Sequence, residues 1–132
     1  MIVAGVGCRR GAPAPEIEGA IRAALARAGI AETALDALAT IVTKQTEAGI
    51  KAAASKLGVP IVAISPTALQ AAGERTQTHS ERVLALAGVP SVAEAAALAA
   101  AGPTARLIAP RLVVGAATCA IAATPPARIG PP

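Results

Sequence analysis

The residues best suited to chemistry lie near the start of the chain, in the sequence GVGCRRG of residues 5–11. Cys8 offers a thiol, while Arg9 and Arg10 offer planar guanidinium groups that donate paired hydrogen bonds to carboxylates or phosphates. Glycine allows positive φ and lets a ligand approach the backbone closely. The glycines that flank these side chains are Gly5, Gly7 and Gly11. The pattern predicts a binding loop for an acidic ligand, and the alternative is a tight turn with two solvated arginines.

The same loop does not match a dinucleotide-binding fingerprint. The third glycine comes one residue late, and Arg10 stands in its place. Asp36 is only a loose match for the acidic residue that would contact a ribose hydroxyl. We therefore expect no nicotinamide or flavin cofactor, and no cofactor of another kind is indicated.

A second group of polar residues, Thr43, Lys44 and Glu47, follows the second expected strand. In a parallel sheet, ligands bind beyond the carboxyl ends of the strands, so this group and residues 7–11 are expected at one edge. These residues are predicted to contact the ligand. The alternative for Lys44 and Glu47 is a simple ion pair across the first turn of a helix.

Catalysis has two weak candidates, Cys8 and His79. A positive potential beside Cys8 would lower the pKa of its thiol, but the sequence places no base next to it, so a packing role is favoured. His79 is the only histidine and falls in the polar stretch of residues 73–80, where a solvated loop residue is the more common case. Cys119 lies in an apolar strand and is expected in the core.

Composition excludes several classes of protein. The chain has 132 residues, a net charge of +4 and no aromatic residue, so it cannot stack bases on aromatic faces. Its basic residues are scattered, and nucleic acid is not expected as a partner. The mean hydropathy of +0.58 derives largely from alanine, and the longest apolar stretch is too short to cross a membrane.

The cysteines and the amino terminus bear on location. Two distant cysteines and a single histidine give no metal-ligand spacing, so no metal site is expected. The chain begins with a strand-like run and not with a basic segment ahead of an apolar one, so no secretory signal is expected. We expect a cytoplasmic protein with free thiols.

Helices and strands must position these residues, and the periodicity of apolar residues predicts that they alternate. Strands are expected near residues 2–6 and at residues 35–42, 59–64, 106–109 and 117–122. Helices are expected at residues 15–28, 47–57, 66–72, 78–86 and 91–101, the last two starting at capping boxes. This order predicts a single-domain α/β sandwich over residues 1–123, with a mostly parallel sheet of about five strands and a proline-rich tail over residues 124–132. The link of residues 110–116 is too short for a helical crossover, so the last two strands are expected to be antiparallel.

Four motifs in order resemble the CobE family and the carboxyl-terminal domain of the cobalamin biosynthesis protein CbiG. They are GVGCRRG at residues 5–11, the group Lys44, Glu47 and Gly49, GVPSVAEAAAL at residues 88–98 and ATCAIA at residues 117–122. The resemblance implies a small α/β protein of corrin-ring synthesis. In CbiG-type proteins the larger polypeptide opens a lactone on a cobalt-precorrin with loss of acetaldehyde.

The resemblance also implies a partner, a precorrin-type tetrapyrrole whose carboxylates suit the paired arginines. Because the likeness is to the carboxyl-terminal domain alone, binding or carrying this intermediate is favoured. The alternatives are a hydrolase acting on a precorrin lactone and a non-catalytic interaction subunit for other corrin-pathway enzymes. Alanine-rich helices are also compatible with a homo-oligomer.

Overall fold

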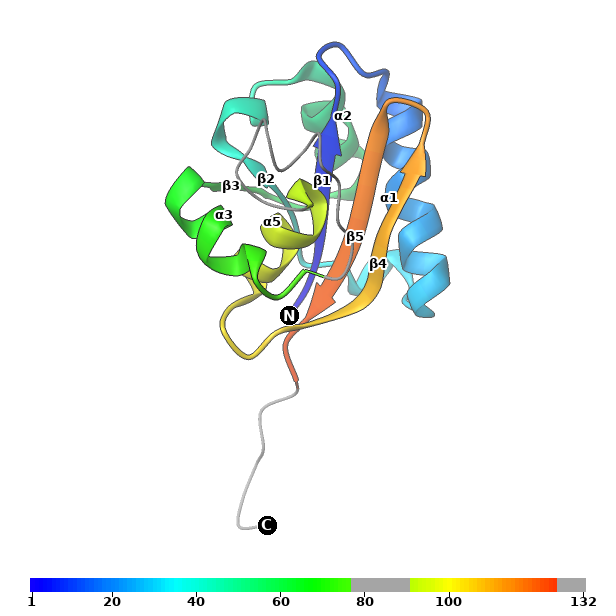
Figure 1. The fold of residues 1–132 in the computed structure, drawn as a ribbon. Helices are drawn as coiled ribbons and strands as arrows, with labels where there is room; N and C mark the ends of the chain where they lie inside the picture. Colours follow the sequence, from blue (N-terminus) through cyan, green and yellow to red (C-terminus); the bar gives the residue numbers. More distant parts are fainter. Residues whose placement is uncertain (77–90, 126–132) are drawn as a thin grey trace.

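The computed structural model describes residues 1–76 and 91–125, which form a five-stranded sheet covered by helices on both faces (Figure 1). The strand order is β3-β2-β1-β5-β4. The strands are β1 (Ile2–Cys8), β2 (Ala37–Ile41), β3 (Ile61–Ile64), β4 (Arg106–Val114) and β5 (Ala117–Ala123). β1, β2 and β3 run parallel, whereas β5 runs antiparallel to both β1 and β4. The expected α/β fold and the antiparallel last pair are confirmed.

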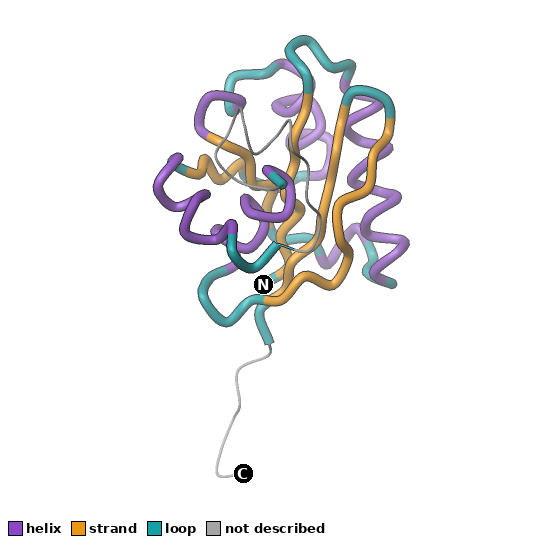
Figure 2. Tube along the Cα trace, viewed as in Figure 1, coloured by secondary structure: helices purple, strands orange, loops and turns teal. Residues whose placement is uncertain are grey.

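In the described part of the chain, helices pack on both faces of the sheet, two on each (Figure 2). They are α1 (Ala14–Ala28), α2 (Ala48–Leu57), α3 (Pro66–Gly73) and α5 (Val92–Ala101). α1 and α2 bury Ile17 and Ile50 on one face, and α3 and α5 bury Leu69 and Leu98 on the other. Two short 3-10 turns, η1 (Glu32–Ala34) and η2 (Val42–Lys44), flank β2. The expected helix at residues 78–86 and the tail from residue 126 lie outside the described residues.

Two glycines end the first two helices as predicted. Gly29 closes α1 with φ of 71°, and Gly58 closes α2 with φ of 70°. Glycine adopts this left-handed conformation without steric cost, which lets its N–H turn back to the last carbonyls of the helix. After α1 the chain passes through η1 to β2, and after α2 a short loop leads to β3.

β4 is longer than predicted, because the strand continues through Pro110 to Val114. A proline is tolerated there since β4 is the outer strand of the sheet, and the register of its pairing with β5 shifts between Ala109 and Leu112, the interval that contains Pro110. The link to β5 is therefore only Gly115 and Ala116, not the whole of residues 110–116. Gly115 has φ of 56°, which suits this tight hairpin.

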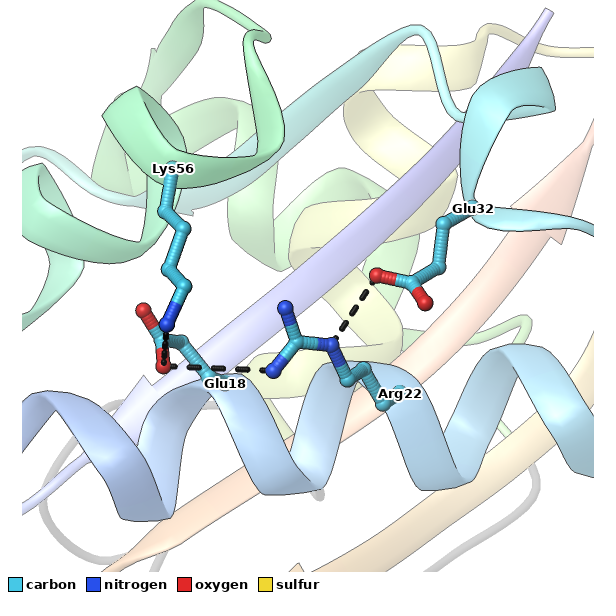
Figure 3. A network of polar contacts seen from close by, with 4 residues as sticks. All are labelled: Glu18, Arg22, Glu32 and Lys56. Carbon is cyan, nitrogen blue, oxygen red and sulfur yellow. Dashed lines mark hydrogen bonds and ion pairs between the residues drawn. The ribbon is translucent and has the colours of Figure 1, made fainter.

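A surface network of charges joins α1 to its neighbours (Figure 3). The Arg22 Nε donates to Glu32 Oε1 of η1 at 2.9 Å, and its guanidinium also lies 4.0 Å from Glu18. Glu18 is in turn 3.6 Å from Lys56 Nζ of α2. The bond to Glu32 raises the pKa of Arg22. Because Arg22, Glu32 and Lys56 are exposed and Glu18 alone is mostly buried, water and salt screen most of the network, and its contribution to stability is small.

Among the described residues, no helix combines the length and the apolar character that a membrane crossing requires.

Candidate functional site

Of the binding loop predicted over residues 5–11, residues 9–11 lie in the turn of residues 9–13 between β1 and α1, drawn in blue at the top of Figure 1, and residues 5–8 belong to β1. This turn lies at the carboxyl edge of the parallel strands, where α/β sheets commonly bind ligands. η2, which follows β2, and the tip of the β4–β5 hairpin lie at this same edge. Residues 8–11 and 43–47, far apart in the sequence, are thus brought together as predicted.

Hydrogen bonds fix the backbone of this turn. The N–H of Arg9 donates to the carbonyl of Ala116 at 3.0 Å, and the N–H of Ala12 donates back to the carbonyl of Arg9 at 3.1 Å. Gly11 takes the left-handed conformation with φ of 74°, and its N–H donates to Glu47 Oε2 at 3.1 Å. The turn therefore has a defined shape before any ligand binds.

Arg9 and Arg10 project from this turn into solvent. Within the part of the chain that the structure describes, neither guanidinium has a hydrogen-bond or ion-pair partner. Each one therefore keeps its full set of donors for a ligand. Nothing else in the described turn competes for these two charges.

The second predicted group contributes a partly buried ion pair. Lys44 Nζ lies 3.9 Å from Glu47 Oε1, so the pairing that the sequence left open is present. Glu47 also holds Gly11, and its side chain is only 17% exposed. Thr43 is exposed in η2, at the same edge of the sheet. β2 ends earlier than expected, at Ile41, because η2 begins there.

Gly5 and Gly7 have a different role from the one predicted. Both lie within β1 and are buried, so neither forms part of the turn, and Gly11 is the glycine of this group with positive φ. A Cβ on Gly5 would overlap the carbonyl of Ala93 and approach the backbone nitrogen of Ala97 to 2.7 Å. These two glycines allow close packing inside the fold, and Gly5 is not reachable by a ligand.

Cys8 lies at the end of β1, half-buried against α1 and α2. Burial raises the pKa of its thiol, Lys44 opposes this effect, and Glu47 adds to it. A lowered pKa is the condition for Cys8 to act as a nucleophile, but desolvation outweighs the opposing charge of Lys44, which agrees with the favoured packing role. Cys119 is buried in the core as predicted, and both thiols are free.

Two further expectations concern His79 and metals. His79 lies outside the described residues. In residues 1–76 and 91–125, no three acidic, cysteine or histidine side chains gather as a metal site would require. The described edge thus offers cationic donors and a thiol.

Sequence reasoning missed Glu16, in the first turn of α1. Its Oε1 accepts a hydrogen bond of 2.7 Å from the N–H of Ala116, at the tip of the β4–β5 hairpin. The only local signal was an acidic residue in a first helical turn, which the helix dipole alone would explain. The partner is 100 residues away, so no local pattern could identify it.

A groove of about 460 Å³ lies away from this edge, between α3 and the end of α5. It is lined by Ala68, Ala71, Ala72, Arg75, Ala99, Gly102 and Pro103. The Arg75 guanidinium there donates to four backbone carbonyls, those of Leu98, Gly102, Pro103 and Ala105. Arg75 thus uses its donors on backbone carbonyls at and after the end of α5, whereas the guanidinium groups of Arg9 and Arg10 are exposed to solvent.

Comparisons with known proteins all find proteins of cobalamin synthesis. The family model "Cobalamin synthesis G C-terminus" matches residues 2–122. Protein CobE of Sinorhizobium sp is 39% identical over 121 residues, which cover 92% of this chain and 79% of the relative. Cobalt-precorrin-5A hydrolase of Priestia megaterium is 36% identical over 98 residues, but these cover 74% of this chain and only 26% of that protein.

Solved structures support the same relationship. The crystal structure of CobE, a protein from the cobalamin (vitamin B12) biosynthetic pathway, matches with a TM-score of 0.86 and 35% identity, over 92% of this chain and 89% of that chain. The structure of cobalamin biosynthesis protein chiG from Agrobacterium tumefaciens matches with a TM-score of 0.74 and 48% identity, over 94% and 98% of the two chains.

Proposed function

Because this chain belongs to the cobalamin synthesis G C-terminus family, we propose that it acts in corrin-ring synthesis by binding or carrying a precorrin intermediate at the turn of residues 9–13. The observation that carries this proposal is that the side chains of Arg9 and Arg10 are exposed and have no partner among the described residues. Both guanidinium groups are exposed on a fixed turn and unpaired within the described chain. Two cations without internal partners suit a ligand with several negative charges.

The chemistry of the ligand supports this proposal. Precorrins carry acetate and propionate groups around the ring, and each charge-assisted hydrogen bond to such a carboxylate contributes about 1.5–3 kcal/mol. The chain has no aromatic residue, so the ring would rest against aliphatic side chains. Val42 is exposed in η2 at the same edge and offers one such contact. An open edge also leaves a large, flat pigment free to leave again.

Binding is favoured over hydrolysis for two reasons. First, the relative described as a hydrolase is much longer, and this chain corresponds to about a quarter of it. Second, burial raises the pKa of Cys8, so its thiol is mainly protonated at neutral pH and is a poor nucleophile. No other described side chain at this edge is arranged as a nucleophile beside a base.

The test is to mix the purified protein with a panel of precorrin intermediates and with hydrogenobyrinic acid, a stable corrin polycarboxylate. Bound pigment is measured after gel filtration, and its mass is then determined. We expect the protein to retain a pigment without changing its mass, and retention to fall in the double variant Arg9→Ala/Arg10→Ala. The matched control is Arg22→Ala/Arg27→Ala on α1, which removes the same charge from another surface and should retain the pigment.

Other outcomes would contradict the proposal. A change in pigment mass that is lost in Cys8→Ala or His79→Ala would indicate a hydrolase. A stable complex with another enzyme of the pathway, without pigment retention, would indicate an interaction subunit. Equal retention by the Arg9→Ala/Arg10→Ala variant would place the binding site elsewhere.

A further inference from the structure

We infer that Glu16 and Glu47 are positioning residues that hold the turn of residues 9–13 from its two sides. This inference rests on the proposed function, because the turn matters only if it binds a ligand. Neither carboxylate contacts the ligand directly in this proposal. Each one instead accepts a backbone N–H and so fixes the segment that carries Arg9 and Arg10.

Glu47 holds the turn from the side of α2. Its Oε2 accepts the N–H of Gly11, and its Oε1 faces Lys44 Nζ, so both oxygens are engaged within the protein. Gly11 directly follows Arg10 and has a left-handed backbone. Without Glu47, its N–H would lose its acceptor and the turn would lose its link to α2. A free carboxylate beside two arginines would also repel an anionic ligand, and these internal bonds reduce that repulsion.

Glu16 holds the turn from the side of the β4–β5 hairpin. Its Oε1 accepts the N–H of Ala116, and the carbonyl of Ala116 accepts the N–H of Arg9. Glu16 therefore acts on Arg9 through a single residue of the hairpin. Gly115 makes this contact possible, because any Cβ at that position would overlap the Glu16 carboxylate.

The two contacts lie on either side of Arg9 and Arg10. A segment held at both ends loses less conformational freedom when a ligand binds, and this preorganisation raises affinity without a new contact. The arrangement also explains why three separate parts of the sequence, around residues 16, 47 and 116, meet at this turn. Glu47, which the sequence placed among the ligand contacts, is thereby assigned to the support of the turn.

The test compares variants that remove the acceptor with variants that keep it. Retention of hydrogenobyrinic acid should weaken about tenfold in each of three variants, Glu47→Ala, Glu16→Ala and Glu47→Asp. In Glu47→Asp the side chain is too short for its carboxylate to reach the N–H of Gly11. Glu47→Gln and Glu16→Gln keep an oxygen acceptor and should retain the pigment at least as well as the wild type. Asp is a favoured helix cap, so Glu47→Asp should still fold if Glu47→Ala does not. The matched control is Glu18→Ala, which removes a paired carboxylate of α1 remote from the turn.

Amide hydrogen exchange provides a second readout that needs no pigment. The N–H groups of Gly11 and Ala116 should exchange faster in the alanine variants at positions 47 and 16, respectively, and should stay protected in the glutamine variants. Circular dichroism confirms that each variant is folded. A structural defect of the whole protein would instead speed the exchange of core amides in β1 as well.

The outcomes separate this inference from the proposed function. If Arg9→Ala/Arg10→Ala loses the pigment while Glu47→Asp and Glu16→Ala retain it, the inference is overturned and the proposed function stands. If alanine and glutamine variants all bind more tightly than the wild type, the carboxylates compete with the ligand, and the inference is again overturned. If the wild type retains none of the tested pigments, the proposed function fails, and this inference fails with it.

Discussion

The carboxylate of Glu94, completely buried in the first turn of α5, accepts a 2.8 Å hydrogen bond from the backbone N–H of Arg111 in β4. Arg111 follows Pro110, where the pairing of β4 with β5 is irregular. An edge strand that loses its regular pairing leaves N–H groups without partners, and burying such a group is costly. Glu94 supplies the acceptor and joins α5 to the outer strand of the sheet.

We expect Glu94→Leu to lower the free energy of unfolding by about 2 kcal/mol, because leucine fills a similar space but accepts no hydrogen bond. Glu94→Gln keeps an oxygen acceptor and should lose less. Urea unfolding of both variants measures the difference. If the two variants are equally stable, the bond to Arg111 contributes nothing and volume alone determines stability at this position.

Gly5→Ala should destabilise the fold by about 3 kcal/mol, because the added Cβ would overlap the backbone of α5 at Ala93 and Ala97. Backbone atoms of a buried helix cannot move aside as a flexible side chain can. Gly19→Ala is the matched control. A Cβ on Gly19, within α1, would lie 3.5 Å from Val114, an ordinary contact, so this variant should be about 0.5–1 kcal/mol more stable in the same urea titration. Equal stability of the two variants would contradict the packing role of Gly5.

Gly11→Ala tests the opposite situation, in which there is space but the backbone conformation is unfavourable. A Cβ on Gly11 would meet no atom within 4 Å, yet φ is 74°. The left-handed conformation costs a residue with a Cβ about 1–2 kcal/mol, and that loss is expected in thermal or urea unfolding. Gly11→Asn should lose less, because asparagine tolerates this conformation better than alanine. A loss as large as that of Gly5→Ala would indicate a steric contact that the structure does not contain.

Much of the fold could be predicted from local sequence, because local patterns fix helix ends and strand periodicity. Gly29 and Gly58 end α1 and α2, and Ser65 and Ser91 cap the helices that follow them. In each case the residue acts on backbone groups within a few positions of itself. The antiparallel last pair was also predictable, because a short link can join strands only in that way.

The parts that could not be predicted depend on contacts between distant residues. The expected strand near residues 2–6 already includes Gly5, but only the structure shows that α5 packs against Gly5, that β1 extends through Gly7, and that Gly11 has the positive φ of the turn. The predicted fourth strand ends at residue 109, before Pro110, because the tolerance of a proline depends on β4 being at the sheet edge and on the bond from Arg111 to Glu94. Glu16 and Glu47 support the candidate site through backbone groups of other elements, which no spacing within the sequence encodes.

The pH dependence of Cys8 distinguishes a packing thiol from a nucleophile. Burial raises the pKa of Cys8, so the rate of its alkylation by iodoacetamide should rise with pH around a midpoint above that of an exposed cysteine, about 8.5. Lys44→Met should move this midpoint higher and Glu47→Gln lower, since Lys44 lowers the pKa and Glu47 raises it. Because folding favours the protonated thiol, this group's contribution to stability is present at neutral pH and is lost as the pH rises through the folded pKa. The experiment uses Cys119→Ser as background, and the single variant Cys8→Ser, which keeps Cys119, should stay unmodified because Cys119 is fully buried. A midpoint below that of an exposed cysteine would mean that the positive charges at the turn outweigh desolvation, and Cys8 would then become the leading candidate for a nucleophile.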